Sequence, residues 1–337
     1  MKTWKKRIAV LITAVALCIG LALGSCSKKT ADLTVYMPDG APALALAGLL
    51  HENAEDDGVE YRVVKSDLIS AQVTYKDETK NADLCVLPVT AASKLVGTGE
   101  QYTMLGVVTH GNLYLIAKDG AEYTSENLSD LIGKTVGVLK INEVPGLTFK
   151  ATLNKSDIPW QELTDGVEKA ADKVNLLAIT GADAVGVAVA DVFLLAEPAA
   201  SAQAKKGYSI VGDIQALYGG ENGYPQAVLI AKNSLLKDRA DWVKEFTEKV
   251  SASSEWLKTA TGEELVSCVT AHLADPSASS DLKAPLLTSE VLGRCGVRFA
   301  YAAESKTEVE DFLAQMRKVN EKAAAIPAED FYWTYSK

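Results

Sequence analysis

The sequence has few histidines and cysteines and no excess of positive charge. Three histidines are scattered along 337 residues, so no histidine-rich metal site is expected. Lys and Arg number 34 against 44 Asp and Glu, and the net charge of -10 argues against a general nucleic-acid binder, because phosphate recognition needs clustered cations. No Gly-x-Ser-x-Gly elbow, phosphate-binding glycine loop or Cys-x-x-Cys pair occurs. We therefore expect no catalytic centre, no cofactor, no metal and no nucleic-acid partner.

The remaining composition is that of a folded protein. Hydrophobic residues make up 48% of the chain and charged residues 23%, values that fit neither a disordered chain nor a protein with many membrane spans. A length of 337 residues favours about two domains.

The N-terminus carries a secretory signal. Basic residues cluster in 2–7, and an almost uncharged apolar run follows over 8–23. The run ends in Leu23-Gly24-Ser25-Cys26, which resembles the lipobox of bacterial lipoproteins. This resemblance implies a lipoprotein signal peptide over 1–25, lipidation of Cys26 and a tether over 26–32. The mature protein is then expected outside the cytoplasm, anchored to the cell membrane by its N-terminal lipid.

Three cysteines remain in the body of the chain. Cys85 lies in an apolar run and is expected to be a small buried hydrophobe. Cys268 and Cys295 could form a disulfide outside the cytoplasm, but the sequence does not supply the distance between them. Their pairing is left open.

Short apolar strands alternate with helical segments over most of the chain, which is typical of α/β folds with parallel sheets. A first series of strands is predicted at 33–37, 61–64, 82–88, 105–108 and 112–118, with a helix at 41–52. A second series follows, with strands at 135–139, 176–179, 192–196 and 209–211 and a helix at 147–153. A glycine-rich break at 219–225 precedes a further strand at 226–232.

The chain after residue 232 is expected to be mostly helical. Helical spacing predicts segments around 242–250, 265–273, 289–301 and 309–325. These helices need a sheet to cover, so we expect the chain to return to its first lobe. The predicted division is lobe 1 over 33–112 and 224–337 and lobe 2 over 113–223.

Three segments resemble a known family. Residues 128–138 are similar to the D-L-x-G-K-x-V-G-V segment of type II periplasmic substrate-binding proteins, and residues 190–198 to their D-A-x-x-x-x-E-P segment. The loop at 36–42 suits the first ligand loop of the nitrate/sulfonate/taurine and thiamine-pyrimidine-precursor group. The resemblance implies a two-lobed Venus-flytrap fold with a discontinuous first lobe. It also implies a monomer that captures a small-molecule ligand and delivers it to an ABC permease with its ATPase.

Ligand contacts are expected where strands end and helices begin, because α/β sheets bind ligands beyond the carboxyl ends of their strands. The predicted contacts are Asp39, Gly40, Ala41, Pro88, Thr90, His110, Asn112, Asn142, Gly146, Thr148, Glu197, Asn222 and Tyr224. Each has an alternative interpretation. The loops could be ordinary helix starts, and His110 could fix its turn through a hydrogen bond. Glu197 could make a hydrogen bond between lobes, and the tyrosines near the second crossing could pack a hinge.

The polar cleft candidates contain acidic and aromatic residues but no arginine, which favours a neutral or cationic flat molecule over an oxyanion. They are Asp39, Glu143 and Glu197, alongside Tyr36, Tyr218, Tyr224, His110 and Asn222. A thiamine-pyrimidine-like nitrogen heterocycle is the first candidate, and an alkanesulfonate is the second. An enzyme of the same fold, of the pyrimidine-precursor or menaquinone-pathway type, and an extracytoplasmic sensor remain as alternative functions. The aromatic C-terminal segment 331–335 is expected to dock on its own domain.

Overall fold

The computed structural model describes residues 31–52, 58–95, 102–219 and 222–335. The predicted signal peptide and Cys26 lie outside these residues. Within the described ranges, no helix combines the length and apolar character that a bilayer crossing requires.

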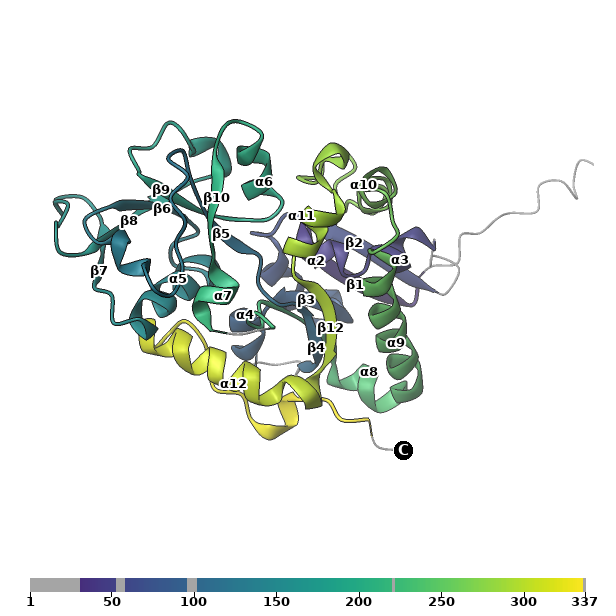
Figure 1. Ribbon diagram of the computed structural model, residues 1–337. Helices are drawn as coiled ribbons and strands as arrows, with labels where there is room; N and C mark the ends of the chain where they lie inside the picture. Colours follow the sequence, from purple (N-terminus) through teal and green to yellow (C-terminus); the bar gives the residue numbers. More distant parts are fainter. Residues whose placement is uncertain (1–30, 53–57, 96–101, 220–221, 336–337) are drawn as a thin grey trace, which may run out of the picture.

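Two six-stranded sheets form the centres of two lobes, which lie side by side in Figure 1. The sheet of lobe 1 has the order β12-β4-β11-β3-β1-β2. Its strands are β1 (Leu33–Pro38), β2 (Val59–Val64), β3 (Leu84–Pro88), β4 (Tyr102–Thr109), β11 (Ala227–Lys232) and β12 (Val297–Tyr301). Strand β1 is parallel to β2 and β3, whereas β11 is antiparallel to both β3 and β4. The sheet is therefore mixed: β1 to β3 have the parallel pairing that the alternation of strands and helices predicts, and β4, β11 and β12 add antiparallel pairs.

The sheet of lobe 2 has the order β10-β5-β9-β6-β8-β7. Its strands are β5 (Leu113–Ala117), β6 (Thr135–Leu139), β7 (Trp160–Leu163), β8 (Val174–Ile179), β9 (Val192–Ala196) and β10 (Ser209–Asp213). Strands β6 to β9 are parallel to one another, and β5 and β10 extend the sheet in antiparallel pairs. The strands predicted at 135–139 and 192–196 are confirmed, while β7 was missed.

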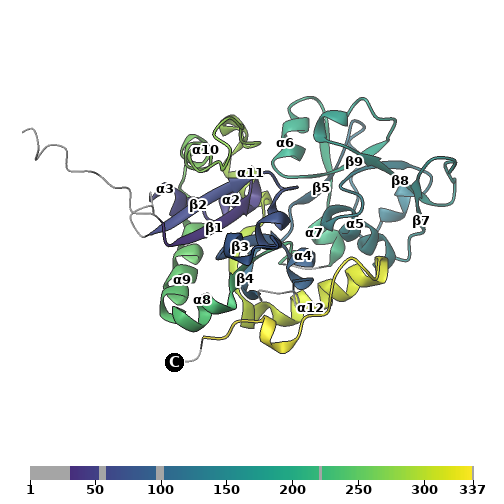
Figure 2. The same ribbon diagram turned by 180° about the vertical axis from the view of Figure 1, so that it is seen from behind.

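Helices cover the sheets of both lobes (Figures 1 and 2). The α-helices are α2 (Ala41–Leu44), α3 (Ala47–His51), α4 (Val89–Ser93), α5 (Val144–Lys155), α6 (Ala199–Ala204), α7 (Ile214–Tyr218), α8 (Asn233–Asp238), α9 (Ala240–Trp256), α10 (Gly262–Ala271), α11 (Ser289–Arg294) and α12 (Ala302–Val319). Short 3-10 turns are η2 (Ile69–Val73), η3 (Glu78–Lys80), η4 (Leu128–Leu131), η5 (Ala182–Ala184), η6 (Ala284–Leu286) and η7 (Glu329–Phe331). The helical spacing of Trp242, Phe246 and Val250 predicts helix α9, which buries Phe246 and Val250 together with Val243, while Trp242 is half-buried.

Two predicted helices differ in the structure. The helix expected over 41–52 is divided into α2 and α3. The helix expected over 289–301 ends at Arg294, and the chain continues as strand β12. Gly296 adopts a φ of 63°, a backbone conformation that ends the helix at little cost only for glycine, and the following Val297–Tyr301 segment is rich in strand-forming residues.

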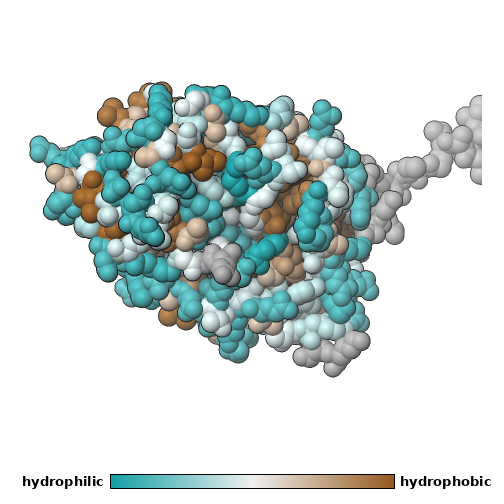
Figure 3. All heavy atoms as spheres, viewed as in Figure 1, coloured by the Kyte–Doolittle hydropathy of each residue, from teal (hydrophilic) through white to brown (hydrophobic). Residues whose placement is uncertain are grey.

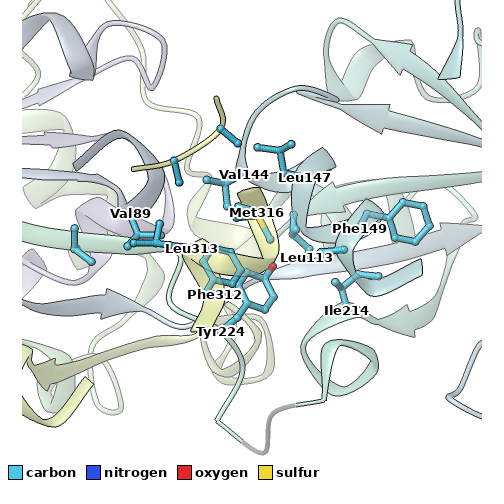
Figure 4. Packing of buried hydrophobic residues seen from close by; sticks show 14 of the residues in the cluster. Val89, Leu113, Val144, Leu147, Phe149, Ile214, Tyr224, Phe312, Leu313 and Met316 are labelled. Carbon is cyan, nitrogen blue, oxygen red and sulfur yellow. The ribbon is translucent and has the colours of Figure 1, made fainter. Parts of the chain in front are cut away.

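Helix α12 runs along both lobes and packs against α5 of lobe 2 (Figures 1 and 2). Phe312 of this helix stacks on Tyr224, with ring centroids 5.3 Å apart and planes only 5° apart. Figure 4 shows these rings among apolar side chains from both lobes. One buried cluster thus continues from lobe 1 to lobe 2 on this side of the molecule.

The chain passes between the sheets between β4 and β5 and again between β10 and β11. The precise lobe limits of 33–112, 113–223 and 224–337 remain a proposal, particularly because α12 contacts both lobes. Hydrophilic side chains cover most of the face shown in Figure 3, and the apolar areas on it are small and separate.

The C-terminal aromatic segment docks on lobe 1, as expected. Phe331 and Tyr332 are buried, and the Trp333 amide donates a hydrogen bond of 2.9 Å to the Met104 carbonyl in β4. The three described cysteines are all buried and free. Cys268 and Cys295 therefore form no disulfide in this structure.

Candidate ligand-binding cleft

A cleft of about 1040 Å³ lies between the two lobes. Lobe 1 contributes the ends of β1 and β3 with the residues that follow them, and lobe 2 contributes the residues that follow β6 and β9. Asn112 and Gln226, one at each chain crossing, also line the cleft. The cleft therefore lies where the strand ends of both sheets meet, as the sequence predicts.

The structure brings eight of the thirteen predicted contact residues into the lining of this cleft. These are Asp39, Gly40, Ala41, Pro88, Thr90, Asn112, Asn142 and Glu197. The other five, His110, Gly146, Thr148, Asn222 and Tyr224, are not among the lining residues. Whether any of the thirteen contacts a ligand remains a prediction.

The loop after β1 is held by the Asp39 carboxylate. Its oxygens accept hydrogen bonds from the Gly40 amide at 2.8 Å, the Ser280 hydroxyl at 2.8 Å and the Asp281 amide at 2.7 Å. Gly40 has a φ of 97°, which only glycine adopts easily. The Asp39 carboxylate is thus already bonded within the protein, and it fixes the start of α2 to a segment more than 240 residues away in sequence.

The loop after β3 places Thr90 in the cleft. The Val89 amide donates a hydrogen bond of 3.0 Å to the Gln226 carbonyl, which ties the start of α4 to the second chain crossing. The Gln226 amide in turn donates to the Thr109 carbonyl at 2.9 Å. Gln226 is therefore held by its backbone between β3 and β4.

The start of α5 supplies Asn142, but the two helix residues predicted with it have other roles. A Cβ atom on Gly146 would lie 2.1 Å from the Ile141 carbonyl oxygen, so the close approach at this glycine is to its own loop. The Thr148 hydroxyl donates a hydrogen bond of 2.7 Å to the Val144 carbonyl and is fully buried. Both residues shape the helix start behind the cleft surface.

Lys150 holds the same loop, and the sequence analysis missed it. Its ammonium group donates to the Ile141 carbonyl at 2.9 Å and to Asn142 Oδ1 at 3.4 Å. It also forms an ion pair of 2.6 Å with Glu162, and the lysine side chain is only 2% exposed. The sequence offered one signal for this role: Lys150 is the single charged residue in the apolar helical run 147–153. A charge that is buried on such a helix needs polar partners nearby.

Glu197 lies at the end of β9 with a fully buried side chain. Its carboxylate accepts hydrogen bonds from Arg294 Nε at 2.6 Å, the Ser201 hydroxyl at 2.7 Å and the Ser201 amide at 3.0 Å. Arg294 is on α11 of lobe 1, so the predicted alternative of an interlobe bond is present in the structure. The sequence did not single out Arg294 or Ser201.

Further polar contacts join the lobes around the cleft. Lys140 of lobe 2 donates to the Ser66 hydroxyl of lobe 1 at 3.0 Å, and Lys205 donates to the Pro285 carbonyl at 2.6 Å. The Tyr114 hydroxyl donates to the Arg294 carbonyl at 3.3 Å. Together with the ion pair between Glu197 and Arg294, these contacts show that the two lobes touch beside the cleft.

His110 and Tyr224 are buried at the chain crossings. Among the residues that the structure describes, neither ring nitrogen of His110 has a hydrogen-bond partner. Burial, with a smaller contribution from the Arg298 cation, lowers the pKa of His110 to about 3. Histidine is thus neutral here at physiological pH. Tyr224 is 1% exposed and packs on α12, as in the hinge-packing alternative, while the Asn222 carbonyl accepts from Arg298 at 2.9 Å.

Asn112 has a defined amide orientation. Its Nδ2 donates to the Glu197 carbonyl at 3.2 Å, and the Glu197 amide donates to the Asn112 carbonyl at 2.8 Å. Asn112 is 3% exposed, and its Oδ1 has no partner among the described residues. Gln226 Oε1 is likewise buried without a partner.

The charges of the cleft differ from those expected. Asp39 is bonded to protein donors, Glu197 to Arg294, and Glu143 to Lys140 at 3.4 Å. The three carboxylates on which the preference for a cation rested are therefore already bonded within the protein, Asp39 through neutral donors and the other two through cations. Lysines 76, 94 and 322 also line the cleft, but no described arginine does. Among the described residues, no group of three or more His, Cys, Asp or Glu side chains could hold a metal ion.

Comparisons with solved structures identify the fold. Neither protein-family models nor curated proteins match the sequence. An ABC transporter structure from Parabacteroides distasonis is similar, with 19% identity and a TM-score of 0.66, over 91% of this chain and 100% of that one. The periplasmic aliphatic sulphonate-binding protein SsuA from Escherichia coli is 13% identical with a TM-score of 0.65, over 90% and 92% of the two chains.

The alkanesulfonate-binding protein SsuA from Xanthomonas axonopodis pv. citri, bound to MOPS, is 12% identical with a TM-score of 0.55, over 88% of this chain and 96% of that one. At these identities the likeness shows the fold alone. The chain has the two-lobed α/β fold of periplasmic binding proteins, as the sequence predicts.

Proposed function

We propose that this chain is the extracytoplasmic substrate-binding lipoprotein of an ABC importer, which captures a small organic solute and delivers it to a permease and its ATPase. The observation that carries the proposal is the cleft of about 1040 Å³, lined from both lobes. Such a volume suits a small solute, and a site between two lobes allows hinge closure on it. The sulfonate-binding proteins that share the fold lend support to a solute-binding role.

The solute that we propose is a flat nitrogen heterocycle of the thiamine-pyrimidine type, with an alkanesulfonate as the second candidate. A desolvated sulfonate needs charge-assisted donors, and no described arginine lines the cleft. Lys76, Lys94 and Lys322 favour the second candidate, because they bring positive charge to the lining. Because the carboxylates of Asp39, Glu143 and Glu197 already have partners within the protein, a neutral heterocycle is a better fit than a cation.

Calorimetry on the purified protein tests the proposal. We expect 4-amino-5-hydroxymethyl-2-methylpyrimidine to bind one-to-one and to raise the melting temperature, because a ligand that binds only the folded state stabilises it. Tight binding of ethanesulfonate in its place would select the second candidate. Turnover of a bound compound would contradict the receptor role and favour an enzyme of this fold.

The membrane anchor is a separate part of the proposal and rests on the sequence, because Cys26 lies outside the described residues. If Cys26 receives the lipid, Cys26→Ser should move the protein from the membrane fraction to the soluble extracytoplasmic fraction. An unchanged membrane fraction would contradict lipidation without affecting the solute-binding role.

A further inference from the structure

Two asparagines line the cleft from opposite lobes, and a protein donor binds the side-chain oxygen of each. Asn81 precedes β3 in lobe 1, and its Oδ1 accepts a hydrogen bond of 2.8 Å from the Tyr75 amide. Asn142 follows β6 in lobe 2, and its Oδ1 accepts one of 3.4 Å from the Lys150 ammonium group. These bonds fix which way each side-chain amide points, because a backbone amide and an ammonium group can only donate.

The nitrogen atoms of the same two side chains are left for the cleft. Neither Asn81 Nδ2 nor Asn142 Nδ2 has a hydrogen-bond partner within the described ranges. Asn81 is only 5% exposed, but its Nδ2 is not one of the fully buried unpaired atoms, so this atom reaches the cleft surface. Asn142 is exposed. Each residue therefore presents an NH₂ group, which can only donate, to a solute between the lobes.

Two further side-chain amides of the cleft lining have the same polarity. Asn320, directly after α12, accepts a hydrogen bond of 3.0 Å from the Lys322 amide through its Oδ1. At Gln226, on the second chain crossing, the oxygen is buried and Nε2 is the accessible amide atom. The donor side of the amide thus faces outward at these positions as well.

The acceptors of the lining are less available to a solute. The Asp39 carboxylate accepts three hydrogen bonds from the protein, and the Glu197 carboxylate is bound to Arg294. Asp67 and Glu78 also line the cleft, but both are exposed to water. The polar groups that are oriented toward a solute and lack a protein partner are therefore mainly N–H donors.

We propose that Asn81 and Asn142 determine specificity by donating hydrogen bonds, one from each lobe, to acceptor atoms on two sides of the solute. This inference rests on the proposed function and specifies the solute chemistry at the same cleft. Ring nitrogens of an aminopyrimidine and oxygens of a sulfonate both supply such acceptors. A solute N–H group in either place would set donor against donor and leave both without a partner.

Aspartate variants reverse the polarity of each side-chain amide while keeping its shape. In Asn142→Asp one carboxylate oxygen keeps the contact with Lys150, and the other replaces the NH₂ group. Asn81→Asp likewise keeps an acceptor for its backbone donor. Asn154→Asp is the matched control, because Asn154 Oδ1 accepts a hydrogen bond of 2.8 Å from Trp160 Nε1 and the residue lies outside the cleft lining. Melting temperatures check that each variant is folded.

Calorimetry at pH 8 measures the binding of three probes. The first is 4-amino-5-hydroxymethyl-2-methylpyrimidine, whose ring nitrogens accept hydrogen bonds. The second, 2-amino-4-methylbenzyl alcohol, carries the same substituents on a benzene ring and lacks these acceptors. The third is ethanesulfonate, which has acceptor oxygens and no donor. The first and third probes distinguish the two sources of acceptor atoms.

We expect the aminopyrimidine to bind at least about 10-fold more tightly than the benzyl alcohol, because each lost hydrogen bond with a protein donor weakens binding by about 3- to 10-fold. Asn81→Asp and Asn142→Asp should each weaken the probe that binds by at least about 10-fold, with no change in Asn154→Asp. For ethanesulfonate the loss should be larger, because the new carboxylate repels the sulfonate.

The other outcomes separate this inference from the proposed function. Binding of the two ring compounds with equal affinity would overturn the inference and leave the receptor role intact. Affinities that both aspartate variants leave unchanged or increase would do the same. Binding of ethanesulfonate that both variants weaken would support the two donors and select the second solute candidate. If none of the three probes binds, the proposed solute classes and the inference fail together.

Discussion

Arg294 Nε on helix α11 of lobe 1 lies 2.6 Å from Glu197 Oε1 at the end of strand β9 in lobe 2. The carboxylate is fully buried, whereas the arginine side chain is 24% exposed and also reaches Glu290. The pair joins the lobes beside the cleft, and Glu197 is bonded through its backbone to Asn112. An ion pair in this position stabilises the lobe arrangement described here, and losing it should favour opening.

Removing the arginine tests this role. We expect Arg294→Gln to lower the free energy of unfolding by about 3 kcal/mol, because it leaves a buried carboxylate without its cation. Small-angle scattering without ligand should show a larger radius of gyration, as the lobes separate. Glu290→Gln is the control, since it removes only the exposed partner and should cost less than about 0.5 kcal/mol. Identical results for the two variants would refute the interlobe role.

The burial of His110 should make the free energy of unfolding of the protein depend on pH. Its pKa is lowered from 6.5 to about 3 in the folded protein, so between these values the unfolded chain binds more protons. Stability from this residue is fully present above pH 6.5 and is lost as the pH falls toward 3. At pH 5 the loss should be about 2 kcal/mol relative to pH 8.

Urea unfolding of His110→Gln measures this contribution. The difference in stability between pH 8 and pH 5 should be smaller in the variant than in the parent protein. His51→Gln is the control, because His51 is exposed and stacks on Trp256. A pH dependence that His110→Gln leaves unchanged would show that His110 is not the group responsible.

A side chain at position 146 should displace a loop that lines the cleft. In Gly146→Ala the new Cβ would lie 2.1 Å from the Ile141 carbonyl oxygen, so the loop that carries Asn142 must move. We expect a loss of about 1–3 kcal/mol in stability and weaker ligand binding. In Gly293→Ala, another helical position, the added methyl group meets nothing within 4 Å, and stability should stay the same or rise. Equal stabilities of the two variants would contradict the prediction.

The hydrogen bonds of Lys150 hold the same loop, so removing them should also lower stability and ligand affinity. Lys150→Met keeps the length of the side chain but removes its bonds to the Ile141 carbonyl and Asn142, as well as the ion pair with Glu162. We expect stability to fall by about 2–4 kcal/mol and ligand affinity to fall with it, because the loop loses its buried donor. Glu162→Gln, which retains an acceptor, should cost less. Unchanged affinity in a folded Lys150→Met would show that the loop does not depend on the lysine.

Much of the fold could be predicted because its signals are local. Apolar runs such as Thr135–Leu139 and Val192–Ala196 are short, bounded by polar residues and buried, and both became strands as predicted. The missed strands β7 and β12 are intermediate in exposure along their whole length, so their sequences carry no clear buried face. Pairing with β8 and β4 made them strands, and such pairing is not visible in local sequence.

The sequence by itself determined most of the order of elements and the main loops that meet at the cleft, because strand ends and helix starts are encoded by neighbouring residues. Only the tertiary structure decided what the polar side chains do. Glu197 could face a ligand or the other lobe, and the choice depended on Arg294, which is 97 residues away in sequence. Asp39 likewise accepts a hydrogen bond from the Ser280 hydroxyl, which is 241 residues away in sequence. Charge compensation and unpaired acceptors such as Asn112 Oδ1 depend on three-dimensional neighbours, which a linear pattern does not specify.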